Sequence, residues 1–139
     1  MTERELGEAL IPQRGAARMV VAVLEAGTDS AVCRGRVPAD SAFVTGGRAP
    51  AVVVLELAAQ AAAVQQALAA PSGGAARPGY LVVLRDATLH ADEVAADAPL
   101  VATVRRTGQA GPLATYEVAV HGADGAAIAT ATLSTHAGG

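Results

Sequence analysis

The stretch that decides the fold is residues 51–69, AVVVLELAAQAAAVQQALA. It contains neither glycine nor proline and is rich in alanine and leucine, which favour helix. Pro50 precedes it, at a place where proline suits the first turn, and the length predicts about five helical turns. Apart from Glu56, Gln60 and two later glutamines, the segment is apolar nearly all the way round. Such a helix is expected to lie buried inside its fold.

The composition limits the classes of protein. The chain has 139 residues, of which 52% are hydrophobic, and a net charge of -3. A high apolar fraction with low net charge excludes intrinsic disorder, and the length predicts a single domain over residues 1–139. The single Cys33 excludes a disulfide scaffold. A nucleic-acid partner is not expected, because only 2% of the residues are aromatic and basic residues are not in excess.

Strand-like segments flank the predicted helix on both sides. Two precede it, over residues 18–26 and 30–37, and a turn signal between them indicates a hairpin. Four follow it, at residues 80–90, 99–106, 113–121 and 126–136. An irregular loop over 38–48, a short helix over 3–10 and a flexible connector over 71–78 complete the prediction. An antiparallel β-sheet wrapped around one long buried helix satisfies this order, which is an α+β fold.

Signals for membranes, export and metal binding are not found in the sequence. The first eight residues are charged, and the apolar run over 49–63 is interrupted by Glu56 and Gln60 and is too short for a bilayer. A soluble cytoplasmic protein without a membrane partner is therefore expected. The acidic residues over 86–97 lack the spacing of metal ligands, so no metal site is expected.

One carboxylate stands out as a candidate for chemistry. Glu56 falls in the second turn of the apolar helix, and Gln60 follows four residues later on the same face. An ionised carboxylate among valine, leucine and alanine is costly unless it is paired or neutralised. A carboxyl group that holds a proton near neutral pH can serve as a general acid. The alternative interpretation is a glutamate that reaches solvent or bonds to a loop backbone.

Three sequence features together resemble a known family. They are Leu10-Ile-Pro-Gln-Arg14, a loop with Phe43, and Val54-Leu-Glu-Leu-Ala-Ala-Gln60. This order is similar to the hotdog-fold 3-hydroxyacyl-(acyl-carrier-protein) dehydratases, which typically show Pro-His-Arg near the start and Glu-x-x-Ala-Gln on the central helix. The stretch Gly79-Tyr-Leu-Val-Val-Leu-Arg85 resembles the aryl-polyene branch. The resemblance covers residues 8–136 and implies a hotdog fold.

The resemblance implies a reaction and roles for particular residues. In the family a histidine takes the α-proton of a 3-hydroxyacyl thioester and a helix carboxylic acid protonates the departing hydroxyl. A trans-2-enoyl thioester is left, here plausibly a growing polyene. On this basis Glu56 is the acid, Gln60 orients it, and the amides of Ala51 and Val52 stabilise the thioester oxygen as it gains charge.

The same resemblance implies partners. The catalytic residues come from opposite subunits in the family, so a dimer is part of the mechanism. The substrate arrives on the phosphopantetheine arm of an acyl carrier protein, and no separate cofactor is expected. Arg48 and Arg85 are candidates to meet the phosphate of that arm or the carrier itself, since arginine binds phosphate bidentately. Arg48 is also a candidate ion-pair partner of Glu56.

The chain departs from the family at the histidine. The loop over 42–50, AFVTGGRAP, contains none, and Gln13 stands in the early Pro-His-Arg position. His90, His121 and His136 fall at or near the ends of predicted strands. The favoured hypothesis is a heterodimer whose second hotdog subunit supplies the histidine while this chain supplies the acid. One alternative is a homodimer that has lost dehydration and serves as a non-catalytic scaffold or partner subunit. The other is a hotdog acyl-thioesterase, whose helix carboxylate activates water.

Overall fold

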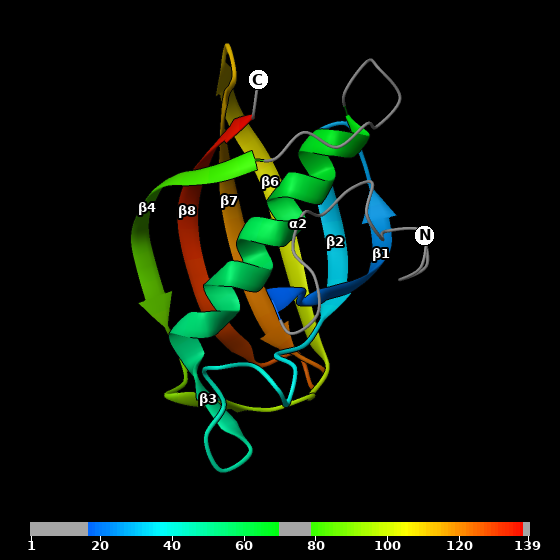
Figure 1. The fold of residues 1–139 in the computed structure, drawn as a ribbon. Helices are drawn as coiled ribbons and strands as arrows, with labels where there is room; N and C mark the ends of the chain where they lie inside the picture. The colour runs from blue at the N-terminus through cyan, green and yellow to red at the C-terminus, as the bar shows by residue number, and fades with distance from the viewer. Residues whose placement is uncertain (1–16, 70–78, 138–139) are drawn as a thin grey trace.

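The computed structural model describes residues 17–69 and 79–137. The predicted helix over 3–10 and the connector over 71–78 lie outside these residues. The described part runs through these elements in order (Figure 1): β1 (Val20–Ala26), β2 (Ser30–Gly35), β3 (Arg48–Pro50), the 3-10 turn η2 (Ala51–Val53), α2 (Val54–Leu68), β4 (Gly79–Leu89), β5 (Glu93–Ala95), β6 (Leu100–Ala110), β7 (Leu113–Gly122) and β8 (Ala127–Ala137).

Six of the strands form one antiparallel sheet in the order β1-β2-β6-β7-β8-β4. Helix α2 crosses one face of this sheet, as Figure 1 shows, so the predicted α+β arrangement is confirmed. The hairpin of β1 and β2 pairs with β6 rather than with β4, which follows the helix and adds to β8 at the other end. Among the described residues, β1 and β4 therefore each leave one edge without a neighbouring strand.

A second, two-stranded sheet lies where the sequence predicts irregular segments. Strands β3 and β5 pair antiparallel, with Ala49 opposite Val94, and both of these side chains are buried. Neither strand is predicted from the sequence, because each has only three residues, too few to show a periodicity. Their effect is to hold the start of the helix: the Ala51 amide donates to the Asp92 carbonyl just before β5, over 2.9 Å.

Small side chains let the helix lie close to the sheet. Ala58, Ala61 and Ala62 on α2 are fully buried. Gly35 of β2 faces Leu57, and a Cβ added there would lie 2.4 Å from the Leu57 Cδ1 atom and 2.6 Å from the Met19 carbonyl oxygen. The close approach therefore requires glycine at this position, because neither neighbour leaves room for a side chain. This packing explains how a chain nearly without aromatic residues builds a dense core.

Cys33 and Tyr116 also belong to this core. Burial raises the pKa of the Cys33 thiol to about 12, so the group stays protonated and is not a nucleophile. Burial likewise raises the pKa of Tyr116 to about 12. The charge of Arg106 lowers this pKa and that of Asp29 raises it, both by less than burial does. The Tyr116 hydroxyl donates to the Gln65 Oε1 atom over 2.6 Å.

The helix is not buried all the way round, which corrects one expectation. Gln60 and Gln65 are each 1% exposed, whereas Glu56 is exposed and Val52 is 51% exposed. The sheet of one chain covers a single side of the helix, so a stripe through Val52 and Glu56 remains outside. The polar residues do not mark the exposed side of the helix, because the buried glutamines satisfy their polar groups inside the fold.

By length and composition alone, Ala51–Leu68 would suffice to cross a membrane, which corrects the expectation that the apolar run is too short for a bilayer. The segment is 61% buried inside the domain, however, and packs on the sheet as its core helix. Its apolar character is accounted for by that packing.

Candidate active site

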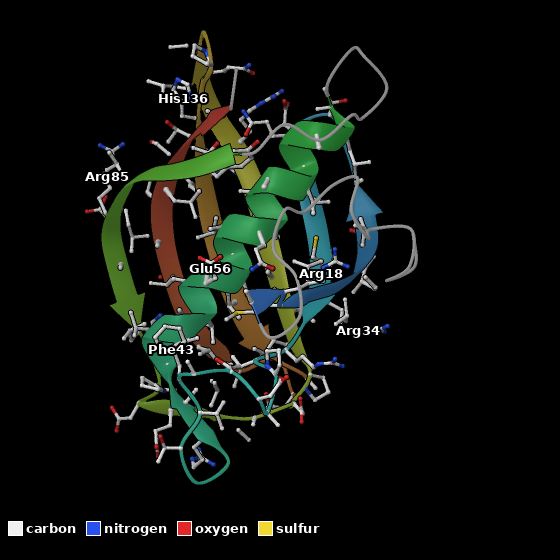
Figure 2. The ribbon with its side chains drawn as sticks, in the orientation of Figure 1. Arg18, Arg34, Phe43, Glu56, Arg85 and His136 are labelled. Carbon is white, nitrogen blue, oxygen red and sulfur yellow. The ribbon has the colours of Figure 1, made fainter. Side chains whose placement is uncertain are left out.

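A pocket of about 520 Å³ opens at the N-terminal end of the central helix. Three separate segments wall it: the chain just before β1, the loop between β2 and β3, and the first turns of the helix. Its lining is mostly small and aliphatic, and its residues are Ala17, Met19, Ser41, Ala42, Phe43, Val52, Val53 and Glu56. Figure 2 shows Phe43 beside the start of α2 and Glu56 on the same helix. Of these residues, Glu56 and Val52 are the site residues expected from the sequence, and Phe43 belongs to the loop that carries the resemblance. The tertiary fold adds the rest of the wall.

Glu56 is the charged residue among those that line the pocket. It is exposed in the single chain, so its carboxylate is not desolvated by this chain's own sheet. The sequence interpretation of a deeply buried carboxylate is therefore wrong for the isolated subunit. The helix end nevertheless places Glu56 at the pocket wall, in the first turn of α2.

Gln60 forms a hydrogen bond with the Glu56 carboxylate and others with the backbone. The Gln60 Oε1 atom accepts from the buried amides of Met19, over 2.8 Å, and Val20, over 3.3 Å. Since an acceptor must face these two donors, the side-chain amide has one possible orientation. Its Nε2 group then donates to the Ala17 carbonyl over 2.7 Å and to the Glu56 Oε1 atom over 3.2 Å. Glu56 and Gln60 therefore lie on the same face of the helix, as expected from their spacing, and are joined by a hydrogen bond.

Replacing Gln60 by leucine should destabilise the fold. The substitution keeps the volume but leaves the buried amides of Met19 and Val20 and the Ala17 carbonyl without their partner. We expect the free energy of unfolding, measured in urea, to fall by about 2–4 kcal/mol. The matched change Gln66→Leu removes one bond, from the Thr135 hydroxyl, and should cost about 1 kcal/mol. Equal losses of unfolding free energy in the two variants would contradict the larger contribution that we assign to the buried hydrogen bonds of Gln60.

The two helix amides expected to bind the thioester oxygen differ in the structure. The Ala51 amide already donates to the Asp92 carbonyl, so it is engaged and does not point into the pocket. No hydrogen bond to an acceptor outside the helix is present for the Val52 amide within the described residues. Val52 also lines the pocket. Of the two predicted amides, that of Val52 is therefore the one that remains a candidate for this role.

The two candidate arginines do not lie in this pocket. Arg48 on β3 forms an ion pair with Glu93 on β5, with 3.2 Å between Nε and Oε1, and not with Glu56 as considered from the sequence. Arg85 lies on the edge strand β4, is exposed, and points away from Glu56 in Figure 2. Neither guanidinium lines the pocket around Glu56, because β3 and β4 carry them to other surfaces.

The loop beside the pocket presents Ala42, directly before Phe43, and no imidazole. His90 is exposed just beyond the end of β4, and His121 and His136 are half-buried near the ends of β7 and β8. None of the three lines the pocket. Within residues 17–69 and 79–137 there is also no group of three or more potential metal ligands. The described residues of the pocket thus offer a carboxylate and a helix amide, and no histidine that could act as the base.

Comparisons with known proteins agree with this architecture. The model of the family described as "ApeP-like: ApeP dehydratase" matches residues 7–138. No curated protein matches the chain. Among solved structures, the dehydratase heterocomplex ApeI:P from Xenorhabdus doucetiae superposes with a TM-score of 0.83 at 18% identity, over 95% of this chain and 90% of that chain.

Two further neighbours have lower TM-scores. A hypothetical thioesterase with coenzyme A from Streptococcus pneumoniae gives a TM-score of 0.61 at 14% identity, over 84% of each chain. A mutant of the phenylacetic acid degradation protein PaaI from Thermus thermophilus gives 0.61 at 23% identity, over 83% of this chain and 90% of that one. These likenesses show a shared fold, and the predicted hotdog architecture is confirmed.

Proposed function

Because the chain belongs to the ApeP-like dehydratase family, we propose that it is the acid-bearing subunit of a dehydratase for 3-hydroxyacyl thioesters carried on an acyl carrier protein. The observation that carries the proposal is the position of Glu56: a carboxylate at the wall of an apolar pocket, at a helix N-terminus, held by Gln60. The product is a trans-2-enoyl thioester, as in polyketide-like or polyene biosynthesis in the cytoplasm.

In this proposal each group of the chain has a defined task. A base from a second subunit removes a proton from C2 of the substrate, and the C2–H electrons form the C2=C3 double bond. The C3–O bond breaks, and protonated Glu56 gives its proton to the departing oxygen, so that one water leaves. The Val52 amide and the helix N-terminus face the thioester oxygen, which carries negative charge in the transition state.

A second hotdog subunit supplies what the single chain lacks. In the isolated chain Glu56 is exposed, and a partner lying over it would exclude water and strengthen its interaction with substrate. The free edge of β4 is a suitable contact, since Val83, Leu84 and Leu89 on that strand are 47%, 39% and 45% exposed. The heterocomplex nature of the ApeI:P neighbour supports such an assembly. We infer that the partner pairs along β4 and supplies the missing histidine.

Arg85 has a separate role in this proposal. It is exposed on β4, points away from the pocket, and forms no ion pair among the described residues. A cation outside any ion pair suits contact with an acidic carrier surface or with the phosphate of its arm. Arg48, which is paired with Glu93, is withdrawn from this role.

The test is dehydration of a 3-hydroxyacyl-carrier substrate. Mass spectrometry of the acylated carrier monitors the reaction as the loss of the mass of one water. Three samples are assayed: this chain alone, a hotdog subunit that is encoded beside it and has the histidine in its loop, and the mixture of the two. We expect activity in the mixture to exceed the sum of the separate activities by at least about tenfold. Full activity of the chain by itself would contradict the need for a second subunit. Unchanged activity of the partner on addition of the chain would favour a scaffold role.

Hydrolysis of the thioester is the second candidate function. It is favoured by the thioesterase neighbour with coenzyme A and by the exposed carboxylate of Glu56, which a water molecule can reach. The same assay separates the two reactions, because hydrolysis releases the free thiol of the carrier arm and dehydration keeps the thioester. Thiol release without an enoyl product would replace the dehydratase proposal by the hydrolytic one.

A further inference from the structure

We propose that the Ser41 hydroxyl is a second hydrogen-bond donor to the thioester oxygen, beside the Val52 amide. The inference rests on the proposed function, since it takes the occupant of the pocket to be an acyl thioester. It deepens that function by one catalytic residue, which supplies the donor that the engaged Ala51 amide cannot supply.

The first observation is the place of Ser41. The residue is 8% exposed and lines the pocket at the N-terminal end of α2. Among the described residues of this wall the side chains are apolar apart from those of Ser41 and Glu56. Since the Glu56 carboxylate accepts from Gln60, Ser41 is the neutral side chain of the wall that can donate to a ligand.

The second observation is that the hydroxyl hydrogen of Ser41 is not used inside the fold. The Ser41 Oγ atom accepts from the Phe43 amide over 3.2 Å. A serine hydroxyl has one hydrogen to donate, and this hydrogen points away from a donor that approaches the oxygen. The part of the chain that the structure describes provides no acceptor for it. Because a buried donor without a partner is costly, an oxygen of a bound ligand would stabilise this arrangement.

The third observation is that the loop holds the hydroxyl in place. The Ser41 amide donates to the Pro38 carbonyl over 3.0 Å, and the Val44 amide donates to the Ser41 carbonyl over 3.1 Å. Both backbone groups of Ser41 and its Oγ atom are therefore bonded before a ligand arrives. A donor that is fixed in this way can stabilise developing charge without first having to reorient.

The chemistry of the reaction indicates which substrate oxygen accepts this bond. Removal of the C2 proton places negative charge on the thioester oxygen, whereas the departing C3 oxygen receives its proton from Glu56. Serine hydroxyls and backbone amides both serve as donors to such a negatively charged oxygen. The Ala51 amide donates to the Asp92 carbonyl instead, which leaves the Val52 amide alone at the helix. The Ser41 hydroxyl, from the opposite wall-forming loop, takes the place of the missing second donor.

The first test is the kinetics of dehydration by the assembled complex. Ser41→Ala removes the hydroxyl and Ser41→Thr keeps it. Thr45→Ala is the matched control, because it removes an exposed hydroxyl of the same loop that does not line the pocket. We expect Ser41→Ala to lower kcat about 10–100-fold and to change KM less than about threefold, because the bond strengthens as charge develops.

Ser41→Thr should retain most of the rate, and Thr45→Ala should leave it unchanged. An unchanged kcat in Ser41→Ala would overturn the proposal, as would an effect on KM alone. Ser41→Cys keeps the size of the side chain but has a weak donor, so its rate should lie between those of serine and alanine. This variant decides the matter if Ser41→Ala fails to fold.

The second test does not depend on dehydration. Butanoyl-pantetheine with an isotope-labelled carbonyl has no 3-hydroxyl, so it can bind without losing water. We expect binding to lower the infrared stretching frequency of the thioester carbonyl, because accepting hydrogen bonds weakens the C=O bond. Ser41→Ala should reverse part of this shift, and Ser41→Thr should keep it. Absence of probe binding, or the same frequency in the unsubstituted and Ser41→Ala proteins, would overturn the proposal.

The two tests separate this inference from the proposed function. A complex that does not dehydrate its substrate, but shows a carbonyl frequency that depends on Ser41, would contradict the proposed function and retain Ser41 as a donor to a bound thioester. A complex that dehydrates equally well with Ser41→Ala would retain the dehydratase and overturn the role of Ser41.

Discussion

Replacing Glu56 by glutamine is expected to lower the rate of dehydration by the assembled complex about 10²–10⁴-fold. The amide has nearly the shape of the carboxyl group but cannot give a proton to the departing hydroxyl. KM should change little, because the acid acts chiefly in the transition state. Initial rates of enoyl formation with a 3-hydroxyacyl-carrier substrate measure the effect.

Two controls separate this loss from a folding defect. Glu56 is exposed, so the free energy of unfolding of Glu56→Gln should remain within about 0.5 kcal/mol of the unsubstituted value. Glu117→Gln changes another exposed glutamate, on β7, which pairs with Arg105 on the face of the sheet away from the helix, and should leave the rate unchanged. A complex that keeps its rate with Glu56→Gln would show that Glu56 is not the acid.

The second large effect is a gain of activity from Ala42→His. Ala42 lines the pocket in the loop just before the helix, where the resemblance puts the histidine of active relatives. With an imidazole there, two copies of this chain would together hold both a base and an acid. We expect the substituted chain, assayed without its partner, to dehydrate substrate at least about 10²-fold faster than the unsubstituted chain. The rate should rise with pH through about 6.5, as the imidazole loses its proton and becomes a base.

Ala39→His is the matched control for this gain, because Ala39 is exposed in the same loop but does not line the pocket. It should confer no activity. Adding Glu56→Gln to Ala42→His should abolish the gain, since the acid would again be missing. A gain that survives Glu56→Gln would mean that the introduced imidazole acts with another acid. No gain at all would indicate that the loops of two copies do not bring Ala42 to the acid of the other.

Much of the fold could be predicted from residues 51–69 and the strand patterns around them. A long apolar segment without glycine or proline can satisfy its backbone only as a helix, and its lack of a polar face requires a sheet to cover it. The two strands predicted before the helix, over residues 18–26 and 30–37, and the four predicted after it are present in the structure, within a few residues of their expected ends. The three-residue strands β3 and β5 were missed, because pairing between segments distant in sequence creates them.

The candidate site was predicted in part. Glu56 and Gln60 follow from helical spacing, since residues four apart share a face, and the structure joins them by a hydrogen bond. The engagement of the Ala51 amide and the pairing of Arg48 with Glu93 could not be foreseen, because both partners belong to β5 or the residue before it. Phe43 was noted as the single phenylalanine, but its exposure at the pocket wall required the loop geometry.

The amino-acid pattern alone thus determines that one helix lies at the centre of a sheet and that it carries one carboxylate near its start. Both follow from local properties: helix propensity, and the scarcity of charge on an apolar segment. The tertiary structure decides which side of the helix remains open. One sheet covers one side, so Gln60 and Gln65 are buried while Glu56 is exposed beside a pocket. Exposure depends on contacts between distant segments, and the open side with its free edge at β4 is where a second subunit would complete the site.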